Sequence, residues 1–334
     1  MKIKKIFAIL LIVISSLGAL TACGSKSSNT NNISGVTAKE VRIATQPSPF
    51  GASVFVAKEK GWIEEELKKL NVTVKWTSFA AGPPMNESFA AGQQDIGIMG
   101  DVPAIVAKAS GQKTNVIANA SYGEKTLALI VKPDSIIKDA KELKGKKVAY
   151  VKGSYGHHLL GLVLENAGLT LNDVESINLP VADISTAVTS GEVDAGVVWE
   201  PSLTKAVNAG QVKVLIDGTG IKRANVFFIA NENFAKSNPK IIEAYVKALN
   251  KASEYIKSNS KEAAKVIQPD INISANELAN LIPKYNFSPI IDDEDIKELK
   301  DVEKFLRTQK LTTTSVNIDN FVDTQYLRSS GLVK

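Results

Sequence analysis

Three segments rich in glycine or proline stand where an apolar run of the sequence ends and an amphipathic run begins. They cover residues 79–87, 95–103 and 152–159. A junction from strand to helix leaves backbone N–H groups without partners at the positive end of a helix dipole, and such groups can bind an anion. Glycine, proline and serine are common at these turns for purely structural reasons, so one turn alone would indicate little. Three of them on one chain predict an anion-binding site.

Each turn offers particular residues for this chemistry. Gly82 allows a ligand to approach the backbone, and Pro83 suits the first turn of a helix. Ser154 can cap a helix or donate to a ligand, and Asp101 is expected to cap the helix that follows it. Because a carboxylate would repel a neighbouring anion, we expect Asp101 and Glu200 to act as helix caps or as carboxylates that bridge a hinge.

Metal, cofactor and catalytic chemistry find little support in the sequence. His157 and His158 are the only histidines, and adjacent residues at a helix start point in different directions, so a zinc site is not expected. Residues 218–220 lack the third glycine of a dinucleotide site, and the sequence has no phosphate-binding loop with Gly-Lys-Ser/Thr. It has no Gly-x-Ser-x-Gly elbow either. We therefore assign no cofactor, no metal and no catalytic residue.

Short apolar runs alternate with amphipathic stretches from residue 41 onward, which predicts parallel α/β sheets flanked by helices. The carboxyl ends of the strands in such sheets line a ligand crevice, and the three turns fall there. The expected strands are 41–44, 72–76, 96–99, 116–118, 147–151, 175–178, 195–198 and 212–215, and the expected helices are 53–59, 62–69, 85–91, 103–109, 158–167 and 184–190.

The last third of the sequence has a different pattern. From residue 239 to the end it is mostly helical, which predicts a tail that wraps around the α/β units. Two apolar strands, 127–131 and 226–230, have no obvious helix between them and their neighbours. We expect these two strands to be the hinge crossings between two lobes.

The first residues have the layout of an export signal. Lys2, Lys4 and Lys5 precede an uncharged apolar run over residues 6–14, which is too short to span a bilayer as a permanent helix. Residues 20–24 resemble a lipobox, in which Cys23 would receive a lipid. We expect a lipoprotein signal peptide over residues 1–22 and a lipid anchor on Cys23, on the extracytoplasmic face of the membrane of a Gram-positive bacterium.

The composition after the anchor limits the classes of partner. Residues 23–38 are rich in serine and asparagine and should form a flexible tether. Because Cys23 is the only cysteine, no disulfide can form within the chain. Three of the five net positive charges lie on the first five residues, so the mature chain carries about +2 and a nucleic-acid partner is not indicated.

Four motifs together resemble the substrate-binding proteins of aliphatic sulfonate, taurine and nitrate importers. The resemblance rests on the motifs in residues 79–83, 95–103, 153–160 and 193–201, and it covers residues 41 to 235. The second motif and the Ala81-Gly82-Pro83 turn are most similar to the alkanesulfonate branch.

The resemblance implies a two-lobed type II periplasmic-binding-protein fold with a ligand cleft between the lobes. Lobe one would comprise residues 39–126 and 222–334, and lobe two residues 127–221. Hinge closure around the ligand would be recognised by the permease of an ABC importer, which works with a cytoplasmic ATPase. We expect a monomer that delivers a small organic anion, most readily an aliphatic sulfonate.

A sulfonate is permanently ionised and has three acceptor oxygens, so its site should offer donors and an apolar lining. The loop 44–51 is longer and richer in proline than in the family, which leaves specificity for the ligand tail open. With the resemblance, the expected ligand-binding residues are Gln46, Phe50, Gly82, Pro83, Gly100, Asp101, Tyr122, Ser154, Tyr155, His157, Trp199 and Phe228.

Other functions remain open at this point. Similar chains bind taurine, nitrate or a pyrimidine precursor of thiamine, and a neutral or cationic ligand would require carboxylates or aromatic rings in the cleft. An extracellular enzyme could use the same scaffold. A surface adhesion lipoprotein would present an open face without a deep cleft.

Overall fold

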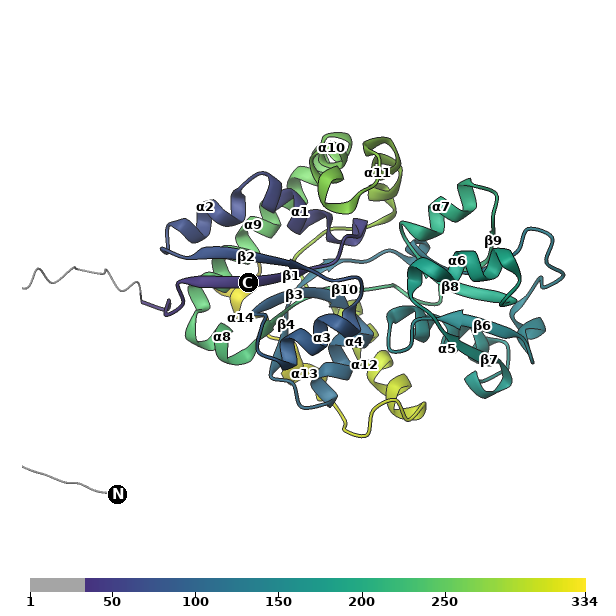
Figure 1. The fold of residues 1–334 in the computed structure, drawn as a ribbon. Helices are drawn as coiled ribbons and strands as arrows, with labels where there is room; N and C mark the ends of the chain where they lie inside the picture. Colours follow the sequence, from purple (N-terminus) through teal and green to yellow (C-terminus); the bar gives the residue numbers. More distant parts are fainter. Residues whose placement is uncertain (1–33) are drawn as a thin grey trace, which may run out of the picture. The chain divides into compact units, whose positions relative to one another are not determined.

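The computed structural model describes residues 34–334, and every structural statement below concerns them (Figure 1). The predicted signal peptide, Cys23 and most of the predicted tether lie outside the described residues. Within the described part, no helix is both long enough and apolar enough to cross a membrane.

A five-stranded sheet with the order β2-β1-β3-β10-β4 forms lobe one. β1 pairs in parallel with β2 and β3, whereas β10 runs antiparallel to β3 and β4. Its strands are β1 (Glu40–Thr45), β2 (Thr73–Ser78), β3 (Ile96–Gly100), β4 (Thr114–Ser121) and β10 (Val226–Asn231).

A second five-stranded sheet with the order β7-β6-β8-β5-β9 forms lobe two. β6 pairs in parallel with β7 and β8, and β5 runs antiparallel to β8 and β9. Its strands are β5 (Leu127–Val131), β6 (Lys147–Tyr150), β7 (Glu175–Asn178), β8 (Ala195–Trp199) and β9 (Lys213–Asp217). The prediction of α/β sheets is confirmed, but each sheet is mixed, with one antiparallel strand next to its centre.

The chain passes between the two sheets at residues 122–126 and 218–225, which link β4 to β5 and β9 to β10. The prediction that residues 127–131 and 226–230 are themselves the crossings is wrong. Every residue of β5 is buried, as are the first five residues of β10. An apolar strand of this kind needs cover on both faces, so it lies inside a sheet, and the turns before it make the crossing.

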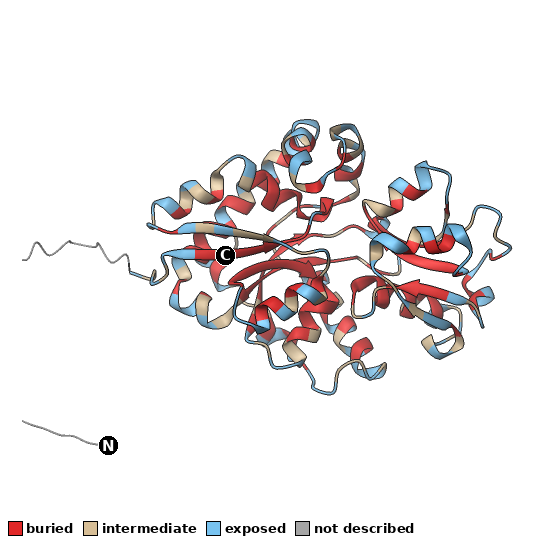
Figure 2. Cartoon of the chain, in the orientation of Figure 1, coloured by how far each residue is buried: buried red, intermediate tan, exposed pale blue. Residues whose placement is uncertain are grey.

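Helices cover both faces of each sheet (Figures 1 and 2). The α-helices are α1 (Ala52–Glu59), α2 (Trp62–Lys68), α3 (Gly82–Ala90), α4 (Asp101–Ala109), α5 (Tyr155–Asn166), α6 (Val181–Ser190), α7 (Ser202–Asn208), α8 (Glu232–Ser237), α9 (Pro239–Ser258), α10 (Ser260–Ile271), α11 (Ala275–Leu281), α12 (Asp293–Thr308), α13 (Ile318–Phe321) and α14 (Gln325–Ser329). The 3-10 helices are η1 (Pro49–Gly51), η2 (Glu124–Thr126), η3 (Ala140–Leu143), η4 (Leu171–Asp173) and η5 (Ile282–Lys284).

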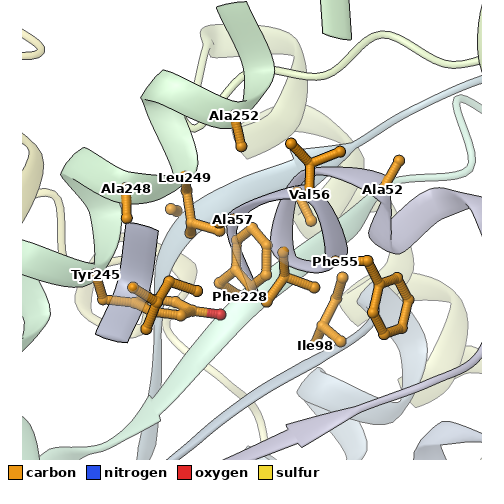
Figure 3. Close-up of a cluster of buried hydrophobic side chains, with 14 of the residues drawn as sticks. Ala52, Phe55, Val56, Ala57, Ile98, Phe228, Tyr245, Ala248, Leu249 and Ala252 are labelled. Atoms are coloured by element: carbon orange, nitrogen blue, oxygen red, sulfur yellow. The ribbon is translucent and has the colours of Figure 1, made fainter. Parts of the chain in front are cut away.

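The main core of lobe one lies between its sheet and helices α1 and α9 (Figure 3). Phe228 of β10 points into this core, where its ring meets Tyr245 edge to face at 5.6 Å. Its neighbour Phe227 points to the opposite face and joins a different apolar cluster. This alternation follows from the two-residue period of a strand, and it directs the Phe228 side chain into the core of the lobe.

The helical tail wraps the α/β units, as the pattern predicts. α9 and α10 pack on α1, while α12 packs on α4. Phe305 of α12 also reaches lobe two, where its ring lies 4.6 Å from the ring of His158 on α5. Gly161 makes this approach feasible, because a Cβ there would lie only 2.2 Å from an atom of the Phe305 ring.

Candidate ligand-binding site

The three predicted turns form the starts of α3, α4 and α5. α4 packs against both α3 and α5, so the three helix starts are neighbours across the two lobes. Their backbone N–H groups nevertheless differ in how many are free for a ligand.

The start of α3 has backbone amides that donate no hydrogen bond among residues 34–334. Pro83 and Pro84 occupy its first turn, as expected, and neither has an N–H group. Within the described residues the amides of Ala81 and Gly82 donate no hydrogen bond. Gly82 is also needed for packing, because a Cβ there would lie 2.5 Å from the ring of Pro103.

The start of α4 offers no free donor, contrary to the prediction for this turn. The amide of Asp101 donates to the carbonyl of Asn225 at 3.2 Å, and the amide of Val102 donates to Asp101 Oδ1 at 2.7 Å. Pro103 has no N–H. The helix cap is Gly100, and Asp101 is the first helical residue. The amides of Asp101 and Val102 are therefore engaged within lobe one and are not available to an anion.

The start of α5 has two free donors. Ser154 caps the helix: its hydroxyl accepts from the amide of His157 at 3.3 Å and donates to the carbonyl of Val151 at 2.8 Å. Among residues 34–334, the amides of Tyr155 and Gly156 have no hydrogen-bond partner. The backbone of this turn offers donors to an anion, whereas the Ser154 hydroxyl proton is already engaged.

Aromatic side chains lie beside this helix start. The rings of Tyr155 and Trp199 are 5.1 Å apart. Tyr155 also lies against Gly100 of lobe one, where an added Cβ would be 3.3 Å from the tyrosine ring. Both aromatic residues are at most 6% exposed, so the lobes are closed over them. Burial raises the pKa of the Tyr155 hydroxyl well above its usual value, and the group stays a hydrogen-bond donor.

Asp101 is held by a buried lysine of the second crossing. The ammonium of Lys222 lies 2.7 Å from Asp101 Oδ2, 2.7 Å from Glu298 Oε1 and 3.0 Å from His158 Nδ1. We call these four residues the Lys222 junction. Asp101, His158 and Glu298 could hold a metal ion by their spacing. However, the ammonium already provides a cation that bonds to all three, which leaves no reason to place a metal there.

Glu200 is held by a lysine from the other lobe. Its carboxylate accepts from the amide of Thr204 at 3.0 Å, from the Thr204 hydroxyl at 2.8 Å and from Lys284 Nζ at 2.6 Å. Its backbone carbonyl accepts from Ser48 Oγ at 3.1 Å. We call these four residues the Lys284 junction. Glu200 thus caps the first turn of α7 and bridges the lobes, as the sequence reasoning expects of a carboxylate near an anion.

His157 is buried, whereas a partly exposed position was the alternative reading of the sequence. Its ring stacks on Tyr150 at 4.6 Å, and Nδ1 accepts from the amide of Gly153 at 3.3 Å. Burial and the charge of Lys152 lower the pKa of His157 to about 4. The side chain is therefore neutral at neutral pH and braces the turn that carries the free amides.

Four other predicted residues lie away from these amides or are already engaged. Gln46 donates from Nε2 to the carbonyl of Ile98 at 2.9 Å and is buried. Phe228 points into the core of lobe one, so the prediction that it lines a ligand tail is wrong, and Phe50 is buried in the same cluster. Tyr122 lies beneath the guanidinium of Arg223 at 3.7 Å and borders a depression of about 620 Å³ beside the two crossings.

Sequence reasoning missed the residues that join the lobes, in particular Ser48, Lys222, Lys284 and Phe305. Lysine is usually exposed, so the sequence gives no signal that Lys222 is fully buried. Lys284 and Phe305 fall in the helical tail, which carries no recognisable motif. Their partners lie far away in the sequence, and only the fold brings them together.

Comparisons with known proteins agree with this architecture. A family model described as NMT1/THI5 like matches residues 49–263. A Bacillus subtilis protein named as aliphatic sulfonates-binding is 30% identical over 326 residues, which cover 96% of each chain.

The crystal structure of the periplasmic aliphatic sulphonate binding protein of Escherichia coli is similar with a TM-score of 0.75 at 26% identity. The match covers 86% of this chain and 93% of that one, and it confirms the predicted two-lobed type II periplasmic-binding-protein fold. A 4-amino-5-hydroxymethyl-2-methylpyrimidine phosphate synthase of Saccharomyces cerevisiae is 26% identical over 234 residues, covering 66% of this chain and 67% of the yeast protein.

Proposed function

The chain belongs to the NMT1/THI5-like family, and we propose that it is an extracytoplasmic receptor that binds a small organic anion and delivers it to an ABC importer. We propose an aliphatic sulfonate as the ligand. The relatives from Bacillus subtilis and Escherichia coli support this choice, because both are named for binding aliphatic sulfonates.

The observation that carries the proposal is the start of α5. Two consecutive amides, those of Tyr155 and Gly156, have no partner among residues 34–334 and sit at the positive end of a helix of 12 residues. Sulfonate oxygens can accept from both amides without any proton transfer. The aromatic rings of Tyr155 and Trp199 lie beside this turn and supply an apolar surface for an alkyl group.

The carboxylates near the site are compatible with an anion because each has a lysine partner. Asp101 is paired with Lys222, and Glu200 is paired with Lys284. The helix dipole therefore attracts an anion at this turn, and the lysine partners of Asp101 and Glu200 offset the repulsion from the two carboxylates. No arginine is required to hold the anion. Binding by neutral donors also keeps release feasible, which a delivery protein needs.

We also propose the lobe boundaries and the location that the sequence indicates. Lobe one would comprise residues 39–126 and 222–334, and lobe two residues 127–221. Residues 1–22 would be removed as a signal peptide, and a lipid on Cys23 would hold a monomeric receptor near its permease in a Gram-positive cell. Two acyl chains give durable anchoring, whereas one gives only marginal binding.

We propose binding without turnover, since the acids and histidines near the site are engaged in packing contacts. The yeast relative is named as a synthase, so we also test whether this chain is an enzyme. The purified chain is incubated with ligand, and the ligand is analysed by mass spectrometry. Chemically unchanged ligand supports a receptor, and a product formed at many turnovers would overturn it.

A thermal-shift panel tests the ligand class. A ligand that binds only the folded chain stabilises it by about 2.7 kcal/mol at a hundredfold excess over Kd. We expect shifts with linear alkanesulfonates and smaller or no shifts with taurine, nitrate and a 4-aminopyrimidine. A shift with the pyrimidine alone would show that the sulfonate assignment is wrong.

A further inference from the structure

Glu200 joins the lobes through both its backbone and its side chain. The residue follows β8 and is fully buried. Its carboxylate accepts from Lys284 Nζ, and its carbonyl accepts from Ser48 Oγ. Glu200 belongs to lobe two, whereas Ser48 and Lys284 belong to lobe one. The three residues therefore hold the closed arrangement without any contribution from the free amides of α5.

Lys284 is positioned by the first crossing. It ends η5, and its carbonyl lies so close to Gly123 that a Cβ on Gly123 would be 2.3 Å away. The next residues pair with the crossing as well, since Tyr122 and Asn286 form an antiparallel bridge. The backbone at Lys284 is thus tied to the point where the chain passes between the lobes, and its side chain extends from there to Glu200.

Water reaches one partner of this ion pair and not the other. The Lys284 side chain is 33% exposed, whereas the Glu200 side chain is fully buried. If the lobes separate, the ammonium can exchange its carboxylate partner for water at little cost. Glu200 would keep its two bonds from Thr204, which belongs to the same lobe. The pair can therefore break and form repeatedly while each lobe stays folded.

We propose that Glu200 and Lys284 form a reversible latch that stabilises the closed lobes and thereby sets ligand affinity without contacting the ligand. This inference rests on the proposed function, because it assumes that closure accompanies binding. The apparent Kd of a ligand rises in inverse proportion to the fraction of protein that can adopt the binding-competent state. Weakening the latch lowers that fraction, so affinity falls although every ligand contact is retained.

The test uses Lys284→Met, which keeps the length of the side chain and removes its charge. We expect the Kd for hexanesulfonate to rise about tenfold by isothermal titration calorimetry, with faster ligand dissociation. The matched control is Lys257→Met, which removes the exposed pair with Glu254 on α9. We expect the control to change Kd by less than about twofold.

A second variant separates the latch from a simple loss of folding. Lys284→Met leaves the buried Glu200 carboxylate without its cation, whereas Lys284→Met combined with Glu200→Gln leaves no unpaired charge. If the latch exists, the double variant unfolds at the wild-type urea concentration and still binds about tenfold more weakly. If the double variant regains wild-type affinity, the lysine acts only by neutralising a buried charge and the latch is excluded.

Distances between the lobes test the latch even if no sulfonate binds. Spin labels are placed at Lys69→Cys and Ile136→Cys, which are exposed positions of lobe one and lobe two, in a chain that carries Cys23→Ser. We expect Lys284→Met to shift the ligand-free distance distribution toward longer values. Identical distributions in wild type and variant would overturn the latch. Absence of sulfonate binding by the wild type would instead overturn the proposed function.

Discussion

Two buried carboxylates follow the ends of strands β3 and β8 and are paired with lysines in different ways. Asp101 bonds to Lys222, and neither side chain is exposed at all. Glu200 bonds to Lys284, whose side chain is one third exposed. Both pairs border the crossings, so the difference between them is access to water. An enclosed pair is a fixed part of the fold, whereas a pair with one hydrated partner can respond to movement of the lobes.

The surroundings of the two pairs support the same distinction. Lys222 bonds to three side chains from three helices, and Phe305 packs on His158 beside it. Separating these groups would leave a buried ammonium without partners. Lys284 has fewer partners, and they belong to one segment of lobe two. The Lys222 junction should therefore govern stability, and the Lys284 junction should govern closure.

The largest effect is expected for Lys222→Met. Removal of the ammonium leaves Asp101 buried without its cation, so the free energy of unfolding should fall by about 3–5 kcal/mol. Urea denaturation followed by circular dichroism measures this change. Adding Asp101→Asn to the variant should recover most of the loss. A loss below about 1 kcal/mol for the single variant would show that the two junctions do not differ in the way proposed.

Acid should weaken the start of α5, where His157 and His158 are both buried. Burial lowers the pKa of His157 to about 4 and that of His158 well below its usual value. Between the usual pKa and the folded pKa, the unfolded chain binds protons that the folded chain excludes. The free energy of unfolding should therefore be highest above about pH 6.5. The part of it that depends on His157, about 3 kcal/mol, should be lost as the pH falls from about 6.5 to about 4.

This pH dependence has a matched variant. His157→Phe retains stacking on Tyr150 and removes the titrating group, so the unfolding free energy should fall less steeply between pH 6.5 and about 4. Urea midpoints measured at several pH values provide the comparison. An unchanged slope in the variant would mean that His157 does not titrate as its burial requires.

Gly161→Ala tests how tightly α12 packs on lobe two beside Lys222. The added Cβ would meet the Phe305 ring at 2.2 Å, which should lower the unfolding free energy by about 1–3 kcal/mol. Combining it with Phe305→Leu provides space and should restore part of the stability. If Gly161→Ala leaves the unfolding free energy unchanged, α12 packs loosely on α5. The region around the Lys222 junction would then not be more rigid than the region around the Lys284 junction.

The smallest effect on stability is expected for Lys284→Met. Because the lysine is partly hydrated and Glu200 keeps its bonds from Thr204, the unfolding free energy should fall by less than for Lys222→Met, by about 1–2 kcal/mol. A thermal or urea melt alongside Lys222→Met gives the contrast directly. A loss as large as that of Lys222→Met would place both lysines in the same structural role.

Local patterns predicted most of the secondary structure of the α/β units and the positions of the turns. The period of two in β10 and the glycine and proline signals before α3, α4 and α5 are properties of short segments, so they can be read without the fold. The cap role of Ser154 and the bridging role of Glu200 also followed from local chemistry. The sequence could therefore indicate an anion site and the class of fold.

Long-range pairing was decided by the tertiary structure alone. The amides before α4 look as free as those before α5 in the sequence, but Asn225 accepts from Asp101 only because β10 returns beside β3. Phe228 faces the core and not the ligand side because of the register of that same strand. Lys222 and Lys284 are ordinary lysines in the sequence. Burial and partners depend on residues that are distant in the chain, and no local pattern contains that information.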